Sequence, residues 1–533
     1  MTEKDPEQDP QQDAQHDPER DDHASPERDR DLRQLARQSG LNLAGSFVAA
    51  ALNLVLPILI TRSLDKTEAG VFFQATALFT IILTISTLGA DTGLVRFLPR
   101  AIAHRRPDDV RATLRISVGP ALAFSVLLAI LLALTAGPLG DLSTGDSPHV
   151  ADLFSGAILI LSVVLPVATV YLLGLAASRG FGAIMPLVLI EKIGRGGVQV
   201  IVCTAVLMVT TSVLWLTLAW SAPYIAALVV LTLWTLDRAR KVMANLSRDG
   251  EAQPPEEGLA SAFWRFSAPR AVSRAFSVAL QRIDIVLIGA LRGPADAALY
   301  TAATRFPILG LMFVQAIQQV MAPKISEFLA LGHRHRALTM YQTTTAWLIL
   351  VSWPIYLASA IFAPLLLQVF GDGYDTASTA VVILCLTMLV ATACGPVDSV
   401  LLMGGRSGLS LMNTGLALVV TVAIDFALIP SYGVTGAAIG WMVGILLNNL
   451  LPLWQVDRIL HMQPFGIATR RAIVLCLAVG VVFGIVGVVG GENVATLLIA
   501  GVLGGALFAL GLWKWHRSME LHAMVAVLRR RRR

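Results

Sequence analysis

The sequence predicts an all-α, polytopic membrane protein with about 14 transmembrane helices: two homologous six-helix lobes around a central cavity, plus two C-terminal helices. Three observations support this fold class. The 533 residues are 55% hydrophobic and only 14% charged, whereas a typical soluble domain has about 25% charged residues. Basic residues alternate from loop to loop, and the two halves of the chain resemble each other.

Fourteen apolar runs approach the ~20 residues that a helix needs to cross ~30 Å of hydrocarbon. The runs at 184–208 and 266–290 contain several charges and are the weakest of the set. The expected spans lie near 41–62, 70–94, 113–137, 153–176, 184–208, 212–236, 266–290, 297–321, 339–362, 378–402, 408–429, 434–455, 471–490 and 495–513.

Basic residues are concentrated in every second loop. One set of loops, with the C-terminal tail, holds 24 basic residues, whereas the alternate set holds only Arg62, Lys66 and Arg292. Basic loops stay in the cytoplasm during insertion. We therefore expect a multi-pass protein of the cytoplasmic (inner or plasma) membrane with both termini in the cytoplasm.

The chain repeats itself at an offset of about 228 residues. Ala69-Gly70-Val71-Phe72 corresponds to Ala297-Ala298-Leu299-Tyr300, and basic His/Arg clusters follow both segments. Because this offset spans an even number of helices, the two lobes are expected to share one orientation. The expected parts are an acidic disordered tail (1–40), an N-terminal six-helix lobe (41–236), a cytoplasmic linker (237–265), a C-terminal six-helix lobe (266–455), two additional helices (456–513) and a basic cytoplasmic tail (514–533).

Composition and motifs argue against an enzyme. No Walker motif, His/Cys ligand set or Ser-His-Asp arrangement stands out, and the four cysteines lie inside apolar runs. No cofactor and no metal are therefore expected. Nucleic acid is not expected as a partner, because the basic residues are scattered between apolar runs instead of forming a basic patch.

Charged and polar residues share one face of the span 266–290. At ~100° per residue they fall within an arc of about 100°, and Arg282 lies off it. Charges inside a membrane helix are costly and usually face a cavity or a partner. This polar stripe therefore predicts the wall of an anion-binding cavity, with inter-helix contact as the alternative. The stripe residues are Arg270, Ser273, Arg274, Ser277, Gln281 and Asp284.

Two further spans extend the candidate site. One face of the span 297–321 carries Thr301, Thr304, Arg305, Gln315 and Gln319. The span 41–62 carries a smaller polar set, Asn42, Ser46 and Asn53. Near the cytoplasmic end of 184–208, Glu191, Lys192 and Arg195 fit either a function or side chains that reach to the interface. Three acids look isolated: Asp91, Asp398 and Asp425.

Short motifs spread over residues 40–515 carry a family resemblance. They are Leu88-Gly89-Ala90 before Arg96-Phe97-Leu98, then Arg282-Ile283-Asp284 with Gly289, Tyr300 and Arg305, then Gly371, Tyr374 and Ala377, and finally Asn413, Asp425 and Ile429-Pro430-Ser431-Tyr432-Gly433-Val434-Thr435-Gly436-Ala437-Ala438. In these motifs the chain resembles the polysaccharide-exporter (oligosaccharide flippase) branch of the multidrug/oligosaccharidyl-lipid/polysaccharide superfamily. The long acidic N-terminal tail, residues 1–40, departs from the family pattern.

The resemblance implies a flippase that moves polyprenyl-pyrophosphate-linked oligosaccharide, a polysaccharide or lipopolysaccharide precursor, across the cytoplasmic membrane by alternating access. The polar stripe agrees with it, because planar guanidinium groups suit a pyrophosphate. A polysaccharide polymerase or glycosyltransferase is a candidate partner. The basic C-terminal tail is a candidate contact for anionic lipid.

Three alternatives stay open. A lipid II (peptidoglycan precursor) flippase shares the fold and the cavity chemistry. A cation-coupled multidrug exporter also shares the fold, but it usually has a carboxylate in its opening helix, and residues 41–62 contain no Asp or Glu. A membrane glycosyltransferase or polymerase needs a large outer loop, whereas the longest one predicted covers only about 138–152.

Overall fold

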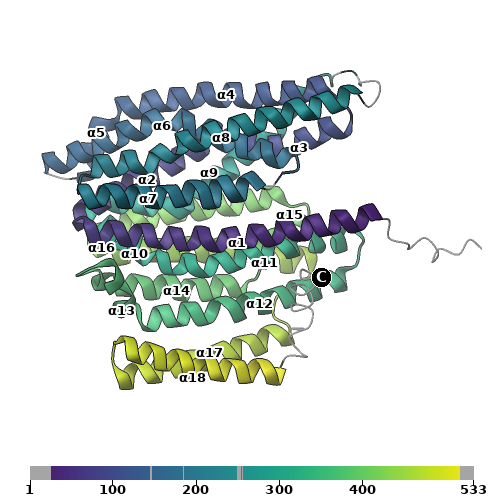
Figure 1. The fold of residues 1–533 in the computed structure, drawn as a ribbon. Coiled ribbons are helices and arrows are strands. Elements are labelled where there is room, and N and C mark those ends of the chain that lie inside the picture. Colours follow the sequence, from purple (N-terminus) through teal and green to yellow (C-terminus); the bar gives the residue numbers. More distant parts are fainter. Residues whose placement is uncertain (1–25, 145–146, 184, 249–253, 255, 516–533) are drawn as a thin grey trace, which may run out of the picture.

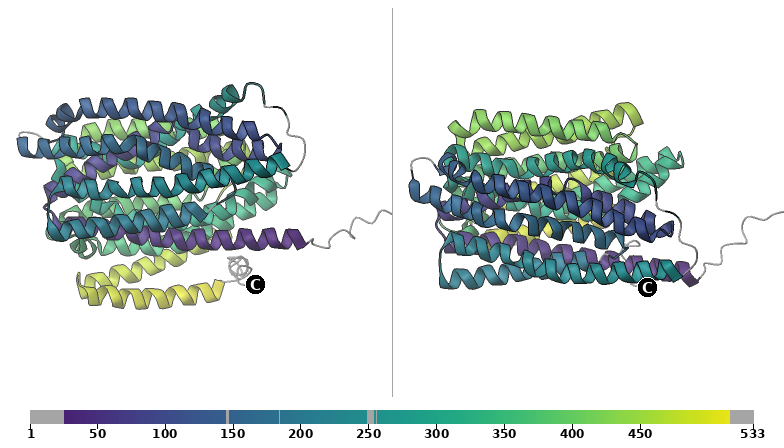
Figure 2. Two further views of the ribbon diagram at one scale, coloured as in Figure 1. Left: turned by 45° about the horizontal axis from the view of Figure 1, so that its top comes forward. Right: turned by 90° about the horizontal axis from the view of Figure 1, so that it is seen from above.

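The computed structural model describes residues 26–144, 147–183, 185–248, 254 and 256–515, and in these residues every regular element is a helix. The long helices lie roughly side by side in one bundle (Figure 1, Figure 2). Eleven of the described helices are long and apolar enough to cross a membrane. The predicted all-α, polytopic membrane fold is therefore confirmed.

The N-terminal lobe comprises the elements from α1 to α8, purple to teal in Figure 1. Two residues in the left-handed region, Leu88 (φ 50°) and Gly89 (φ 71°), divide the predicted span 70–94 into α2 and α3. A π-helix, η1, forms the first part of the predicted span 184–208. The elements are α1 (Pro26–Ser63), α2 (Lys66–Ser86), α3 (Ala90–Ala103), α4 (Pro107–Leu134), α5 (Ala136–Thr144), α6 (Pro148–Gly180), η1 (Leu187–Arg195), α7 (Gly196–Val209) and α8 (Val213–Arg248).

The C-terminal lobe comprises the elements from α9 to α16, and α17 and α18 lie beside it, away from the N-terminal lobe (Figure 1). The predicted span 297–321 is divided at Thr304. The elements are α9 (Leu259–Arg292), α10 (Pro294–Ala303), α11 (Arg305–Ala330), α12 (Arg334–Ile361), α13 (Ala363–Leu367), η2 (Gln368–Phe370), η3 (Asp375–Ala377), α14 (Ser378–Ala393), α15 (Val397–Met403), α16 (Ser407–Leu460), α17 (Ile467–Gly490) and α18 (Val494–Trp515).

Helix α16 is a single element of 54 residues that folds back on itself at Gly433. Gly433 has φ 52° and ψ −128°, a conformation that glycine adopts because it has no Cβ. Asn413 and Gln455, 42 residues apart, exchange two side-chain hydrogen bonds of 2.7 and 2.9 Å. The predicted spans 408–429 and 434–455 are therefore the two arms of one helical hairpin.

Small residues bring the two arms of α16 together. Gly436, Gly440 and Gly444 recur every four residues along the second arm and face the first arm. Gly440 lies against the carboxylate of Asp425, and Gly444 lies against the hydroxyl of Thr421. Glycines at this spacing let two helix backbones approach closely where no hydrophobic effect drives packing.

The number of fourteen spans stays a prediction. The eleven candidates are selected by length and hydropathy. This selection leaves out α9 and the α10–α11 segment, and it counts the α16 hairpin as one span. Counting both arms of α16 and the two omitted segments separately is compatible with fourteen.

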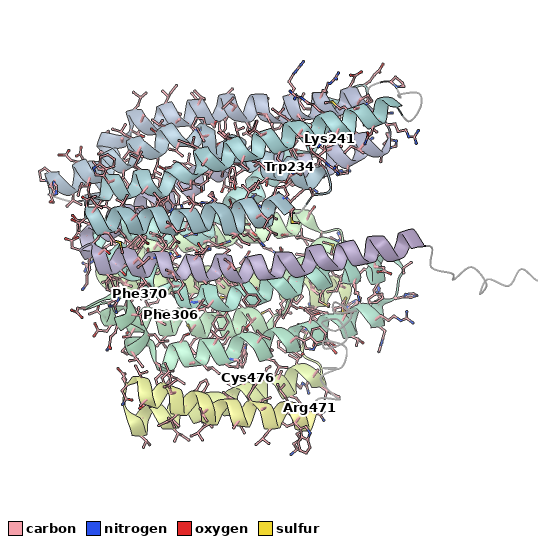
Figure 3. The ribbon with its side chains drawn as sticks, in the orientation of Figure 1. Trp234, Lys241, Phe306, Phe370, Arg471 and Cys476 are labelled. Carbon is pink, nitrogen blue, oxygen red and sulfur yellow. The ribbon has the colours of Figure 1, made fainter. Side chains whose placement is uncertain are left out.

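The basic loops lie at one end of the bundle, here called the basic end. Lys241 and Arg471 lie toward that end, whereas Phe306 and Phe370 lie toward the opposite end (Figure 3). At the opposite end the lobes touch each other: Arg62 Nε donates a 2.7 Å hydrogen bond to the carbonyl oxygen of Val369. Arg62 is thus an inter-lobe contact in addition to being a loop charge.

Candidate functional site at the seam between the lobes

Helix α9 forms the seam between the lobes, because it packs against α2 and α3 on one side and against α16 on the other. Gly93 lies against Ser267, and Gly289 lies against Gln74, whose Nε2 donates a 3.3 Å hydrogen bond to the carbonyl oxygen of Val286. The order of these contacts makes α2 and α3 antiparallel to α9 along its length. The stripe predicted on α9 is therefore positioned by both lobes.

The predicted stripe divides by burial along α9. Its exposed residues are Arg270, Arg274 and Gln281, its half-buried residues are Ser273 and Ser277, and its buried residue is Asp284. The exposed part lies between the inter-lobe contacts at Ser267 and Gly289. Between these two contacts α9 presents an accessible polar face.

Arg274 connects the two lobes through Asp91 at the start of α3. Its Nε lies 3.6 Å from Asp91 Oδ2. Because the Arg274 side chain is 58% exposed, this ion pair contributes little stability, about 0–1 kcal/mol. Arg179, at the end of α6, lies within electrostatic range of both residues. Asp91, which looks isolated in the sequence, therefore has an arginine from each lobe beside it.

Arg270 lies over an aromatic ring of its own helix. Its Nη1 donates a 3.0 Å hydrogen bond to the carbonyl oxygen of Phe266, and its guanidinium carbon is 3.6 Å from the centroid of the Phe266 ring. Arg96 of α3, which the sequence indicates only as a loop cation, lies over the same ring at 4.2 Å. Sequence reasoning missed this role, although Arg96 stands in the motif Arg96-Phe97-Leu98.

Asp284 belongs to a buried cluster of acids inside the C-terminal lobe. The Tyr300 hydroxyl donates a 2.7 Å hydrogen bond to Asp284 Oδ2. Asp425 of α16, also buried, lies within electrostatic range of Asp284. Asp284 Oδ1, both carboxylate oxygens of Asp425 and the Thr421 hydroxyl find no hydrogen-bond partner among the described residues. Two neighbouring buried carboxylates stay charged together only with a cation beside them; otherwise one of them takes up a proton.

Arg305 and Arg282 form a second group of cations. Arg305 is 9% exposed, and its Nε donates a 3.2 Å hydrogen bond to the carbonyl oxygen of Thr301. Arg282 is close enough for the two positive charges to repel each other. Arg282 therefore lies off the α9 stripe but beside another predicted site residue. The Thr301 hydroxyl has no hydrogen-bond partner in the described part of the chain.

The remaining predicted residues lie apart from these groups. Gln315 is exposed on α11, whereas the side chains of Gln319 and Asn42 lie outside the described residues. Asn53 is exposed and lines a cavity of about 100 Å³ between α1, η1 and α7.

That cavity contains a charged network in the N-terminal lobe. Arg195 donates two 2.7 Å hydrogen bonds to Glu191, which also accepts a 2.7 Å bond from the Tyr171 hydroxyl. Lys192 Nζ donates a 2.7 Å bond to the Ser46 hydroxyl. Glu191 and Lys192 are therefore held by side chains of α6 and α1, which the interpretation as side chains that reach to the interface does not explain. π-Helical segments such as η1 are frequent at functional sites.

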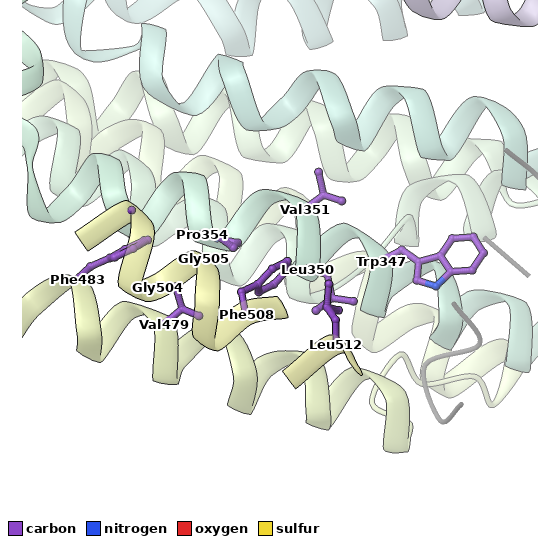
Figure 4. A pocket seen from close by; sticks show the side chains of 11 residues that line it. Trp347, Leu350, Val351, Pro354, Val479, Phe483, Gly504, Gly505, Phe508 and Leu512 are labelled. Atoms are coloured by element: carbon purple, nitrogen blue, oxygen red, sulfur yellow. The ribbon is translucent and has the colours of Figure 1, made fainter. Parts of the chain in front are cut away.

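An apolar groove of about 410 Å³ lies between α12, α17 and α18 (Figure 4). Leu350, Phe483 and Phe508 line it together with Gly504, which leaves room between the helices. None of the predicted site residues is on these three helices. The groove can accept an apolar chain, and nothing in it recognises a charged group.

No group of three or more His, Cys, Asp or Glu residues that could hold a metal ion occurs within the described ranges. The four cysteines are buried and free. The charged chemistry described so far is therefore that of arginines and paired carboxylates.

Comparisons with known proteins agree with these features. The family described as "Polysaccharide biosynthesis protein" matches residues 35–329, more than half of the chain. The chain belongs to this family. A second family, described as "MatE", matches residues 269–427.

Individual relatives of this polysaccharide biosynthesis protein are distant. The probable low-salt glycan biosynthesis flippase Agl15 of Haloferax volcanii is 21% identical over 288 residues, which cover 53% of this chain and 58% of that one. The chain thus spans little more than half of that relative. An uncharacterized membrane protein of Methanocaldococcus jannaschii, MJ1068, is 18% identical over 89% of this chain and 94% of its own length.

Solved structures share the fold of this family member. The lipid II flippase MurJ in an inward closed conformation has a TM-score of 0.71 at 12% identity, with 89% of this chain and 98% of that chain covered. A multidrug resistance MATE family transporter in an inward-facing conformation has a TM-score of 0.60 at 15% identity, covering 80% and 94%. The resemblance found in the sequence is confirmed, and the chain is a multi-pass membrane protein with the fold that these flippase and transporter structures share.

Proposed function

We propose that this chain is a flippase that moves polyprenyl-pyrophosphate-linked oligosaccharide from the inner to the outer leaflet of the cytoplasmic membrane. The basic end faces the cytoplasm in this proposal, in agreement with the retention of basic loops on that side. The lipid-linked glycan enters between the lobes, and its pyrophosphate contacts the arginines at the seam.

The observation that carries the proposal is the excess of arginine over carboxylate along the seam. Arg270, Arg282 and Arg305 form no ion pair with a carboxylate of the described residues, and Arg274 has only the exposed pair with Asp91. A cation in a membrane protein without an acid partner favours an anionic ligand, because its desolvation must be offset. Guanidinium groups bind phosphate oxygens through two parallel hydrogen bonds.

The same observation argues against a drug exporter with a cationic cargo. Such a cargo needs carboxylates that face the cavity, whereas Asp284 and Asp425 are 1% and 0% exposed. In the described part of the opening span, residues 45–62, no acid occurs. Lipid II also carries a pyrophosphate on a polyprenyl chain. The two candidate substrates therefore differ in the sugar part attached to the pyrophosphate.

The test uses the full chain reconstituted in vesicles with polyprenyl-pyrophosphate-linked oligosaccharide on one leaflet. Wild type should move it, and Arg270→Ala and Arg274→Ala should reduce the rate at least about tenfold, the loss expected for one charge-assisted hydrogen bond. Arg238→Ala on α8, a cation outside the site, is the matched control. Dye efflux without lipid-linked sugar movement would favour the exporter, and movement of lipid II alone would favour the peptidoglycan alternative.

A further inference from the structure

The ring of Phe266 holds a guanidinium group from each lobe. Arg270 of the C-terminal lobe lies 3.6 Å from the ring centroid, and Arg96 of the N-terminal lobe lies 4.2 Å from it. Both guanidinium groups therefore contact the same ring. Their carbons are within about 8 Å of each other, a separation at which physiological salt does not fully screen the repulsion.

The positive charge around Phe266 is not balanced. Arg96 and Arg270 are exposed, and neither forms an ion pair with an acid among the residues that the structure describes. One helical turn beyond Arg270, Arg274 adds a third cation, and Arg179 of the N-terminal lobe adds a fourth. Within the described ranges, the carboxylate that pairs with these four arginines is that of Asp91. Each lobe therefore contributes two cations.

Aromatic packing holds the lobes together against this repulsion. Phe97 of α3 contacts Phe263 and Phe266 of α9, with ring centroids 5.4 and 5.9 Å apart. Phe97 and Phe263 are 4% and 0% exposed. The contact between the lobes is thus favoured by apolar burial and opposed by charge, and a change in charge shifts the balance between closed and separated lobes.

We propose that these four arginines and Phe266 form a charge-operated latch, in which Arg96 and Arg179 bind the pyrophosphate of the cargo together with Arg270 and Arg274. The inference rests on the proposed function for the identity of the anion. A pyrophosphate between the lobes accepts hydrogen bonds from both pairs of arginines and converts repulsion into attraction. It binds the closed seam more tightly than a separated one, because only the closed seam offers all four guanidinium groups, and this difference in affinity drives closure.

The test measures closure with full-length protein in detergent. Spin labels at His104→Cys and His333→Cys, both exposed loop positions near the basic end, report the distance between the lobes. Geranyl diphosphate and inorganic pyrophosphate should both shorten this distance, whereas geraniol and phosphatidylglycerol should not. An equal shortening by phosphatidylglycerol would make the cluster a phospholipid headgroup site and overturn the proposal.

Variants separate binding from folding. Arg96→Gln should weaken the binding of geranyl diphosphate at least about tenfold and abolish the shortening. Arg96→Lys should restore part of both, since lysine keeps the charge but loses the planar fork. Arg238→Gln, a cation on α8 outside the cluster, should behave as wild type. Wild-type binding and shortening in Arg96→Gln would overturn the latch.

A flipping assay on the same variants distinguishes the two proposals. If wild type moves lipid-linked oligosaccharide and Arg96→Gln does so at the same rate without any shortening, the latch is wrong and the proposed function stands. If wild type closes on geranyl diphosphate but moves no lipid-linked sugar, the latch stands and the proposed function is wrong.

Discussion

At the residue scale, the site is built from arginines whose positive charge is only partly offset. The spacing of residues along a helix predicts that Arg270 and Arg274 share one face of α9. In the structure both side chains are exposed between the lobes. The sequence could not show Arg96 or Asp91 as their neighbours, because α3 reaches α9 only through the pairing of two distant helices. Nor could helical phase place Arg282 beside Arg305, since these residues stand on α9 and α11, and α10 lies between those helices in the chain.

Lysine substitutions test how the arginines act on the cargo. Arg270→Lys and Arg274→Lys should give flipping rates between those of wild type and the alanine variants, because lysine keeps the charge but cannot form two parallel hydrogen bonds. The rates are measured in reconstituted vesicles with lipid-linked oligosaccharide. Lysine variants as slow as alanine variants, at normal protein levels, would show that charge alone contributes nothing.

The buried acid pair predicts a different effect. Asp425→Asn removes one ionisable group but keeps the shape of the side chain, so the protein should insert and fold normally. If the pair exchanges a proton or a cation during transport, this variant should lose the dependence of flipping on a proton or sodium gradient. Asp398→Asn is the control, because Asp398 accepts a 2.5 Å hydrogen bond from the Ser410 hydroxyl and lies outside the pair. An unchanged gradient dependence in Asp425→Asn would contradict this role.

At the element scale, the apolar runs predict where the helices lie along the chain, but they do not predict where a helix is interrupted. The sequence predicted separate spans at 408–429 and 434–455, and the structure shows why they work as one hairpin: Gly433 makes the turn and three glycines close it. The π-helix η1 and the left-handed pair Leu88 and Gly89 were not predicted. They depend on contacts with other helices, such as that of Gly89 with Ala271, that apolar periodicity does not record.

The hairpin gives a stability prediction. Gly433→Ala should destabilise the protein by about 1–3 kcal/mol, because its φ of 52° is unfavourable for a residue with a Cβ. Thermal unfolding of the purified protein in detergent should show a lower midpoint. Gly505→Ala on α18 is the control, since nothing lies within 4 Å of the added carbon. Equal midpoints for the two variants would mean that the turn tolerates a side chain.

At the scale of the whole molecule, loop charge predicts which end of the bundle faces the cytoplasm. Gly408 lies near the basic end and Glu492 near the opposite end, and both are exposed. In a variant without the four buried cysteines, an impermeant thiol reagent applied to intact cells should label Glu492→Cys and spare Gly408→Cys. The same reagent applied to inverted vesicles is the control and should label Gly408→Cys. Labelling of Gly408→Cys alone in intact cells would invert the orientation.

The attachment of the last two helices bears on how the protein is made. α17 is held mainly by α12, through the hydrogen bonds of Thr469 with Gln342 and of Cys476 with Ile349, and α18 packs on α17. Both helices follow the two lobes in the chain, so the ribosome completes them after α12. Until this pair arrives, the side of α12 that α17 covers is open to lipid, and the pair displaces that lipid when it packs.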